Sequence, residues 1–131
     1  MYLDKNAILG SVDLPREEVS VPEWGGKVLV RGLTAQERDA LEESTVQRNS
    51  EGVVKVIYDN MRARLASLTI VDGDGNRIFT QADVEALGNK SGAALDRIFD
   101  VAQRLSGMTK KSKEVALKNS QTTQEGDSNI A

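Results

Sequence analysis

The sequence predicts an α+β domain in which two β-hairpins, at about residues 18–32 and 68–79, pack with about four helices and precede a flexible C-terminal tail. Three observations indicate this class. Alternating valines flank a Gly-Gly turn, capped amphipathic stretches follow them, and apolar residues become rare after Met108. A chain of 131 residues has room for one domain with a modest core.

The first hairpin is predicted by two alternating runs on either side of the segment PEWGG. Val19 and Val21 belong to the first run, and Val28 and Val30 belong to the second. Glycine supplies the positive φ that tight turns between such runs require. Trp24, the only tryptophan, lies in this segment. We expect it to pack on the sheet as a core anchor, and the alternative is an exposed anchor for a partner protein.

The second hairpin is predicted at the segment IVDGDGNRIFT, which also resembles a calcium-binding loop. Asp72, Asp74 and Asn76 match the first three ligand positions of an EF-hand. Arg77 stands where that loop needs glycine, and Asp83 stands where it needs a bidentate glutamate. Because short β-branched runs flank the Asp-Gly pair, we interpret the segment as a hairpin turn whose carboxylates accept backbone N–H bonds. A calcium-binding module stays the alternative.

The remaining periodic segments predict helices. A short helix begins after an Asp4 cap and ends at Gly10, and Thr34 with Glu37 forms a capping box for the next helix. The other predicted helices run from Val53 to about Leu65, from Thr80 with Asp83 to Gly88, and from Ser91 to Gly107.

Two helical faces have more than one interpretation. The last helix carries an apolar stripe made of Leu95, Ile98, Phe99, Ala102 and Leu105. Such a stripe is typical of a core face, and the alternative is a face for a partner helix or a second copy. Arg62 and Arg64 resemble a basic patch, but we interpret them as the solvated side of an amphipathic helix.

The domain boundary is predicted at residue 108. Residues 109–131 contain four lysines, two glutamates, one aspartate and no aromatic residue. Such a segment buries too little apolar surface to offset an ordering entropy of about 1–2 kcal/mol per residue. We therefore expect a folded domain over residues 1–108 and a flexible polar tail over residues 109–131.

Composition excludes several function classes. The chain has no cysteine and no histidine, which excludes thiol chemistry, zinc fingers and a Ser-His-Asp triad. A net charge of −3 provides no general attraction to nucleic acid, and neither a signal-peptide pattern nor a membrane-spanning apolar run is present. No nucleophile–base pair is recognisable, so an enzyme is not expected. The sequence predicts no catalytic, cofactor-binding or metal-binding residue.

Two stretches carry a family resemblance. VPEWGGKVLVRGLTAQER (residues 21–38) and VDGDGNRIFTQADVEAL (residues 71–87) resemble the tail assembly chaperones of long-tailed, siphovirus-type bacteriophages and prophages. The likeness covers about residues 5–107 and includes the order of hairpin, capped helix, acidic turn and final helix. It transfers no partner-binding residue, so these residues stay unknown.

The resemblance implies a non-enzymatic function in the cytoplasm of the bacterial host. Such a protein would bind the tape measure protein, a long and largely helical chain that aggregates easily, and keep it soluble during tail tube assembly. It would form homo-oligomers, could contact the tail tube protein, and would be absent from the mature virion. Many members also have a longer form made by ribosomal frameshifting. The alternative is a structural virion protein, such as a tail tube or connector subunit.

Overall fold

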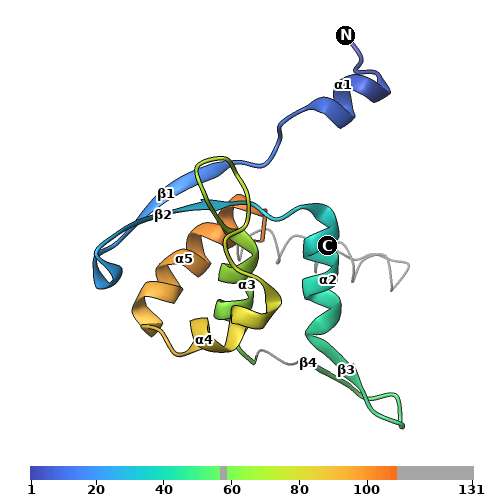
Figure 1. The fold of residues 1–131 in the computed structure, drawn as a ribbon. Helices are drawn as coiled ribbons and strands as arrows, with labels where there is room; N and C mark the ends of the chain where they lie inside the picture. Colours follow the sequence, from blue (N-terminus) through green and yellow to red (C-terminus); the bar gives the residue numbers. More distant parts are fainter. Residues whose placement is uncertain (57–58, 109–131) are drawn as a thin grey trace, which may run out of the picture.

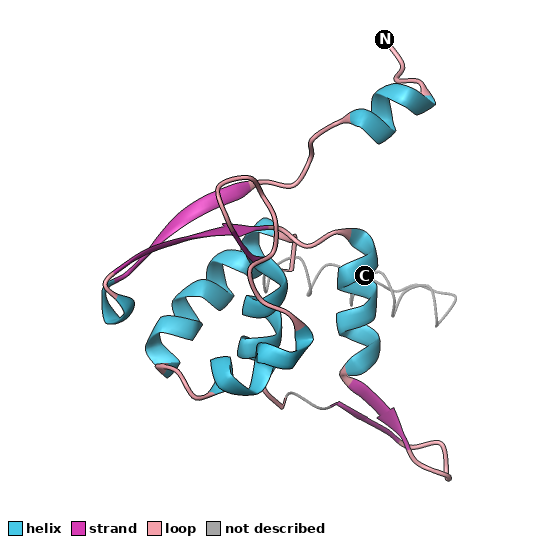
Figure 2. Cartoon of the chain, viewed as in Figure 1, coloured by secondary structure: helices cyan, strands magenta, loops and turns pink. Residues whose placement is uncertain are grey.

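The computed structural model describes residues 1–56 and 59–108. The fold is α+β, as predicted, with a three-stranded and a two-stranded antiparallel sheet (Figures 1 and 2). In chain order the elements are α1 (Lys5–Gly10), β1 (Arg16–Val21), η1 (Pro22–Trp24), β2 (Gly26–Arg31), α2 (Ala35–Ser44), β3 (Val46–Arg48), β4 (Val54–Val56), α3 (Met61–Thr69), β5 (Ile70–Val71), η2 (Gln81–Asp83), α4 (Val84–Gly88) and α5 (Gly92–Leu105).

The main sheet has the strand order β1-β2-β5 and confirms the first predicted hairpin. Val19 pairs with Val28 and Val21 pairs with Gly26 across the β1–β2 ladder. Gly25 closes the turn at φ 77°, a conformation that favours glycine. Val19, Val21 and Val30 are buried on the face toward α5, which contacts both β1 and β2, and α3 packs against α5 (Figure 1).

The second predicted reversal is present but has a shorter ladder than expected. Residues 68 and 69 belong to α3, so β5 has only two residues, which pair with β2. The return strand is reduced to a bridge between Val71 and Arg77 and a hydrogen bond from the Ile78 N–H to the Ile70 carbonyl. The Thr69 hydroxyl donates to the Leu65 carbonyl at 2.8 Å and extends α3 into this region.

The helix predicted from Val53 to about Leu65 is wrong over its first half. There the structure has a hairpin of β3 and β4, with Val46 opposite Val56, and α3 begins only at Met61. The Asn49 side chain accepts N–H bonds from Glu51 and Val53, at 2.9 and 3.0 Å, and closes the turn. This turn chemistry, together with β-branched valines, outweighs the helical spacing of the same apolar residues.

The predicted caps at Asp4, Thr34, Thr80 and Ser91 are confirmed, whereas α3 ends at Thr69 and not at about Leu65. Carboxylates and hydroxyls of Asp4, Thr34 and Ser91 accept N–H bonds at the starts of α1, α2 and α5, at 2.8, 3.0 and 3.2 Å. The Asp83 carboxylate accepts the Thr80 N–H at 2.8 Å. Gly107, at φ 71°, ends α5 by donating to the Arg104 carbonyl, as glycine does in many helix C-termini.

The linker between β2 and α2 passes close to the end of α5. The Leu33 N–H donates to the Ser106 hydroxyl at 2.8 Å, and the Gly32 N–H donates to the Pro15 carbonyl at 3.0 Å. A side chain at position 32 would meet the Leu105 carbonyl oxygen at 2.6 Å. Glycine therefore allows the backbones of β2 and α5 to approach closely, and this junction joins the start of the fold to its end.

The core lies between the sheet, α3 and α5. Its largest fully buried apolar side chains are Leu65, Ile70, Ile98, Val21 and Val30. The apolar stripe predicted on α5 faces this core. Leu95, Ile98 and Ala102 are buried, and Phe99 and Leu105 pack at the edge of the core. The predicted tail, residues 109–131, lies outside the described residues.

Candidate partner-binding surfaces

Large apolar side chains are exposed mainly in two elements that project from the body (Figure 1). One is the segment of residues 1–13, which we call the N-terminal arm. The other is the β3–β4 hairpin. Clusters of exposed apolar residues of this kind mark interaction sites more often than isolated ones do. The exposed side chains are Met1, Tyr2, Leu3, Ile8, Leu9 and Val12 in the arm, and Val46, Val53 and Val54 in the hairpin.

The N-terminal arm forms a helix without help from the core. Every residue of the arm is exposed, and Leu9 keeps 73% of its accessible surface. The Asp4 carboxylate caps the start of α1, and the Ser11 hydroxyl donates to the Ile8 carbonyl at 2.8 Å at its end. An isolated helix shorter than about 12–15 residues is marginal in water. Docking onto a partner surface would therefore stabilise the helix of the arm.

The β3–β4 hairpin also lacks a core of its own. Val53 and Val54 keep 57% and 47% of their accessible surface. Figure 1 shows the hairpin extending beyond the end of α2, away from the main sheet. Because an isolated two-stranded hairpin is only marginally stable in water, its valines are available to a partner that covers them.

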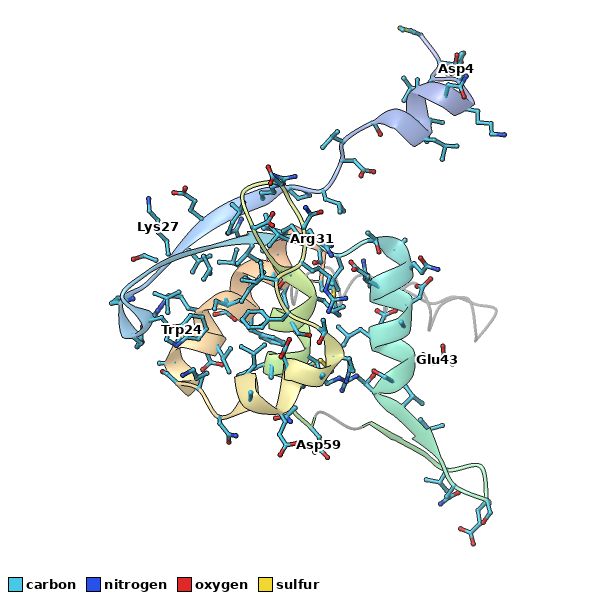
Figure 3. The ribbon with its side chains drawn as sticks, viewed as in Figure 1. Asp4, Trp24, Lys27, Arg31, Glu43 and Asp59 are labelled. Carbon is cyan, nitrogen blue, oxygen red and sulfur yellow. The ribbon has the colours of Figure 1, made fainter. Side chains whose placement is uncertain are left out.

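An apolar groove lies on the body, on the side of the β1–β2 turn. It has a volume of about 200 Å³ and is lined by Trp24, Phe79, Asp83, Ala86, Leu87 and Lys90. We call it the aromatic groove. Trp24 and Phe79 pack against the core but stay half-exposed, so each contributes one side to the groove. Figure 3 shows Trp24 at the turn, beside the α4–α5 half of the body. Trp24 therefore packs on the core, as expected, and also borders an open surface.

Ion pairs hold the turn that carries Trp24 against α5. Arg97 donates to both oxygens of Glu23, at 3.0 and 2.9 Å, and Arg104 donates to Glu17 at 2.8 Å. The hydrogen bonds from Arg97 lower the pKa of the Glu23 carboxyl to about 2. Both arginines lie on α5, so the two bridges join β1 and its following turn to that helix.

A further ion pair holds α2 to the sheet. Buried Arg31 donates to both oxygens of Glu37, at 2.8 and 2.9 Å, and Glu37 also accepts the Thr34 N–H at 3.0 Å. Burial alone would raise the pKa of the Glu37 carboxyl, but the hydrogen bonds from Arg31 and Thr34 outweigh it and lower this pKa. The capping box predicted from sequence is thus also an anchor between elements, which sequence spacing did not indicate.

A second apolar groove opens between α2, α3 and α5. It has a volume of about 140 Å³ and is lined by Leu41, Glu42, Thr45, Met61, Leu65, Phe99, Gln103 and Met108. It lies where the described chain ends, at Met108.

The residues that match calcium-ligand positions in the sequence have local structural roles. Asp72 accepts N–H bonds from Asp74 and Asn76, at 2.9 and 3.0 Å, which confirms the predicted turn chemistry. Asp83 is used by the Thr80 cap and does not join that turn. Within residues 1–56 and 59–108 no three histidine, cysteine, aspartate or glutamate side chains gather as a metal site would require.

The two arginines of α3 lie in different surroundings. Arg62 is exposed, as predicted, and its guanidinium pairs with Asp96 and lies 5.7 Å from the centre of the Phe99 ring. Arg64 is half-buried and donates to the Ser44 hydroxyl. In the part of the chain that the structure describes, no helix has the length and apolar composition needed to cross a bilayer.

The sequence alone did not indicate that the N-terminal arm or the β3–β4 hairpin would be a candidate binding surface. The apolar residues of the arm were visible, but nothing local shows that the core leaves them uncovered. Val53 and Val54 fall within the helix predicted from Val53 to about Leu65, whereas the turn signal from Asn49 to Gly52 could have indicated a hairpin.

Comparison with known proteins identifies the family of this chain. The family model described as phage tail assembly chaperone matches residues 5–122. The structure of the bacteriophage HK97 tail assembly chaperone is similar in fold, with a TM-score of 0.54 and 20% sequence identity over 72% of this chain and 84% of that chain. A comparison with curated proteins found no match. The family match extends over most of the chain and agrees with the two stretches that carry the sequence resemblance. This protein therefore belongs to the phage tail assembly chaperone family.

Proposed function

We propose that this protein binds the tape measure protein and keeps it soluble while the tail tube assembles, in the cytoplasm of the bacterial host and without entering the mature virion. The function is non-enzymatic. Family membership supports a role in tail assembly. The observation that carries the finer proposal is the β3–β4 hairpin, which projects from the body with exposed Val46, Val53 and Val54.

The chemistry of this hairpin suits a long helical chain that aggregates easily. These valines are already about half buried, so covering the rest of each side chain stabilises a complex by roughly 1 kcal/mol before the cost of association is subtracted. One hairpin therefore binds weakly and reversibly. Many copies bound along one tape measure chain hold it firmly through avidity, and each copy can still leave as tube subunits arrive. A contact with the tail tube protein at that step belongs to the same proposal.

We also propose that the copies associate with one another, since neighbouring bound copies would then support each other. Sedimentation of the purified protein over a range of concentrations tests this part. A monomer at all concentrations up to the high micromolar range would contradict it.

Co-expression tests the tape measure proposal. The tape measure protein of the same phage is expressed with and without this chain, and its soluble fraction is measured. We expect a clear increase with the wild-type chain and a loss of that increase with Val54→Lys, because a buried lysine ammonium is costly. Ser50→Lys, an exposed turn substitution in the same hairpin, is the matched control and should behave like wild type. An equal soluble fraction with and without the chain would refute the proposal.

Analysis of purified virions distinguishes the chaperone function from that of a structural virion protein. A chaperone is absent from finished particles, whereas a tail tube or connector subunit is present in many copies. Detection of this chain at the copy number of a structural component would favour the latter function.

A longer form made by frameshifting is a further part of the proposal. A −1 slip needs an A-rich heptamer, and two places permit one: Thr109-Lys110-Lys111 read as A AAA AAG, and Leu117-Lys118-Asn119 read as A AAA AAC. Both places lie outside the described residues. Sequencing the gene tests this, and the absence of both heptamers, or of an overlapping −1 frame, would exclude a longer form made at these sites.

A further inference from the structure

We propose that residues 113–118 of this chain dock into the second apolar groove of the same copy, where the Leu117 side chain enters beside Met61 and Phe99. These residues read KEVALK, and we call them the tail segment. They lie outside the described residues. The contact is made within one chain, so it goes beyond the proposed function and does not rest on it.

The second apolar groove has room for one aliphatic side chain. Its volume is about 140 Å³, and a cavity of about 150 Å³ lined by leucine, isoleucine and phenylalanine takes up a benzene molecule. Met61 and Phe99 line the groove, pack against the core and stay partly exposed. Covering their exposed surface removes apolar area from water, which favours docking of an apolar side chain.

The described chain ends at this groove. Met108 is buried in the core cluster and lines the groove, and its N–H donates to the Gln103 carbonyl at 2.7 Å. Residues 109–116 separate Met108 from Leu117. These eight residues extend to roughly 26–29 Å, which is enough for a chain to leave the groove and return to it. The tail segment is therefore tethered at the groove itself and has no distance across the body to cover.

Leu117 is the apolar side chain after Met108 that fits this position. The apolar residues after Met108 are Val115, Ala116, Leu117, Ile130 and Ala131. The first three are contiguous, and the family match, which extends to residue 122, includes them and not the last two. Lysine flanks the contiguous group on both sides, whereas Ile130 follows Glu125 and Asp127. Apolar content, charge and the matched range thus indicate the same segment.

The charges of the two surfaces are opposite. Among the described residues that line the groove, only Glu42 is charged, and its exposed contact with Arg38 at 3.5 Å leaves acceptor positions free on the carboxylate. Apart from Glu37, which pairs with Arg31, α2 has three acids and one arginine. Residues 109–118 have four lysines and one glutamate. Because exposed ion pairs contribute little, charge here selects which segment docks rather than how tightly it docks.

Tethering favours the tail segment of the same copy over that of a second copy. A short linker holds a segment at an effective concentration in the millimolar range, whereas a second copy supplies it only at the protein concentration. One leucine in a groove is a weak contact, so it forms when tethered and not between dilute molecules. The docked tail segment covers Met61 and Phe99, and another apolar chain has to displace it to use this groove.

Cysteine cross-linking tests the contact, because the chain has no cysteine of its own. Ala116→Cys is combined with Glu42→Cys, at the groove, or with Glu43→Cys, the matched control. Both glutamates are exposed neighbours on α2, and Figure 3 shows Glu43 on the side of α2 that faces away from α3 and α5. In dilute protein under mild oxidation we expect the internal disulfide to form at least tenfold faster with Glu42→Cys. Equal rates, no disulfide, or a disulfide-linked dimer in place of the internal product would overturn the proposal, the dimer in favour of a second copy.

Methyl NMR of the full chain supplies the second measurement. Of the three methionines, Met61 and Met108 line the groove, and Met1 lies in the exposed N-terminal arm. With ¹³C-methyl-labelled methionine, Leu117→Ser should shift the signals of Met61 and Met108 and leave that of Met1 unchanged. Ile130→Ser is the matched control and should shift none of the three. Unchanged Met61 and Met108 signals in Leu117→Ser, or equal shifts in both variants, would overturn the proposal.

Discussion

Gly32→Ala is expected to be the most informative single substitution for stability. A methyl group at position 32 would lie 2.6 Å from the carbonyl oxygen and 3.1 Å from the carbonyl carbon of Leu105. These atoms belong to the backbone of α5 and cannot rotate away as a side chain can. Overpacking of this kind costs about 1–3 kcal/mol, and separation of the two backbones also weakens the Leu33–Ser106 hydrogen bond, which adds about 1 kcal/mol.

The expected loss is thus about 2–4 kcal/mol, or a fall of roughly 10–20 °C in melting temperature for a domain of this size. Urea titration followed by circular dichroism and by Trp24 fluorescence measures it, and coincident curves establish two-state unfolding. Gly26→Ala is the matched control, because a methyl group there meets no atom within 4 Å. Its midpoint should equal that of wild type or lie slightly higher. Equal midpoints for the two variants would refute the close approach of β2 and α5.

Three further outcomes are expected. Glu37→Gln should lower stability by roughly 1.5–3 kcal/mol in urea titration, because buried Arg31 loses its charged partner; an unchanged midpoint would show that the pair contributes nothing. Glu23 and Glu37 have folded-state pKa values below the ordinary value of 4.5, so their stabilisation is present above that pH and is lost as pH falls through the folded-state pKa, which is about 2 for Glu23. Glu23→Gln should therefore flatten the decrease in melting temperature over this window, and an identical pH profile would contradict the Arg97 bridge. Deletion of residues 109–131 should change the melting temperature by only a few degrees, and loss of cooperative unfolding would show that the tail belongs to the core.

The candidate surfaces show why function was harder to predict than fold. Family membership followed from two stretches rich in turn and cap residues, and the family match confirms it. The aromatic groove, in contrast, needs Trp24, Phe79 and Leu87, which are more than 50 residues apart at the extremes and meet only after α4 packs beside the β1–β2 turn. The Arg31–Glu37 pair likewise joins a strand to a helix through a side-chain geometry that spacing alone does not specify.

The sequence by itself determined the elements whose causes are local. The turn at Gly25, the caps at Thr34 and Ser91, and the turn at Asp72 all depend on hydrogen bonds or φ values set within about four residues. Only the tertiary structure decided the elements whose causes are distant. The arm has apolar residues that a core could have covered, and the valines of the β3–β4 hairpin, whose turn is closed locally by Asn49, stay exposed because no distant surface of the described residues covers them. Local hydrogen bonds are fixed by neighbours in the chain, whereas burial depends on which distant surfaces meet, and there the packing of α3, α5 and the sheet made the choice.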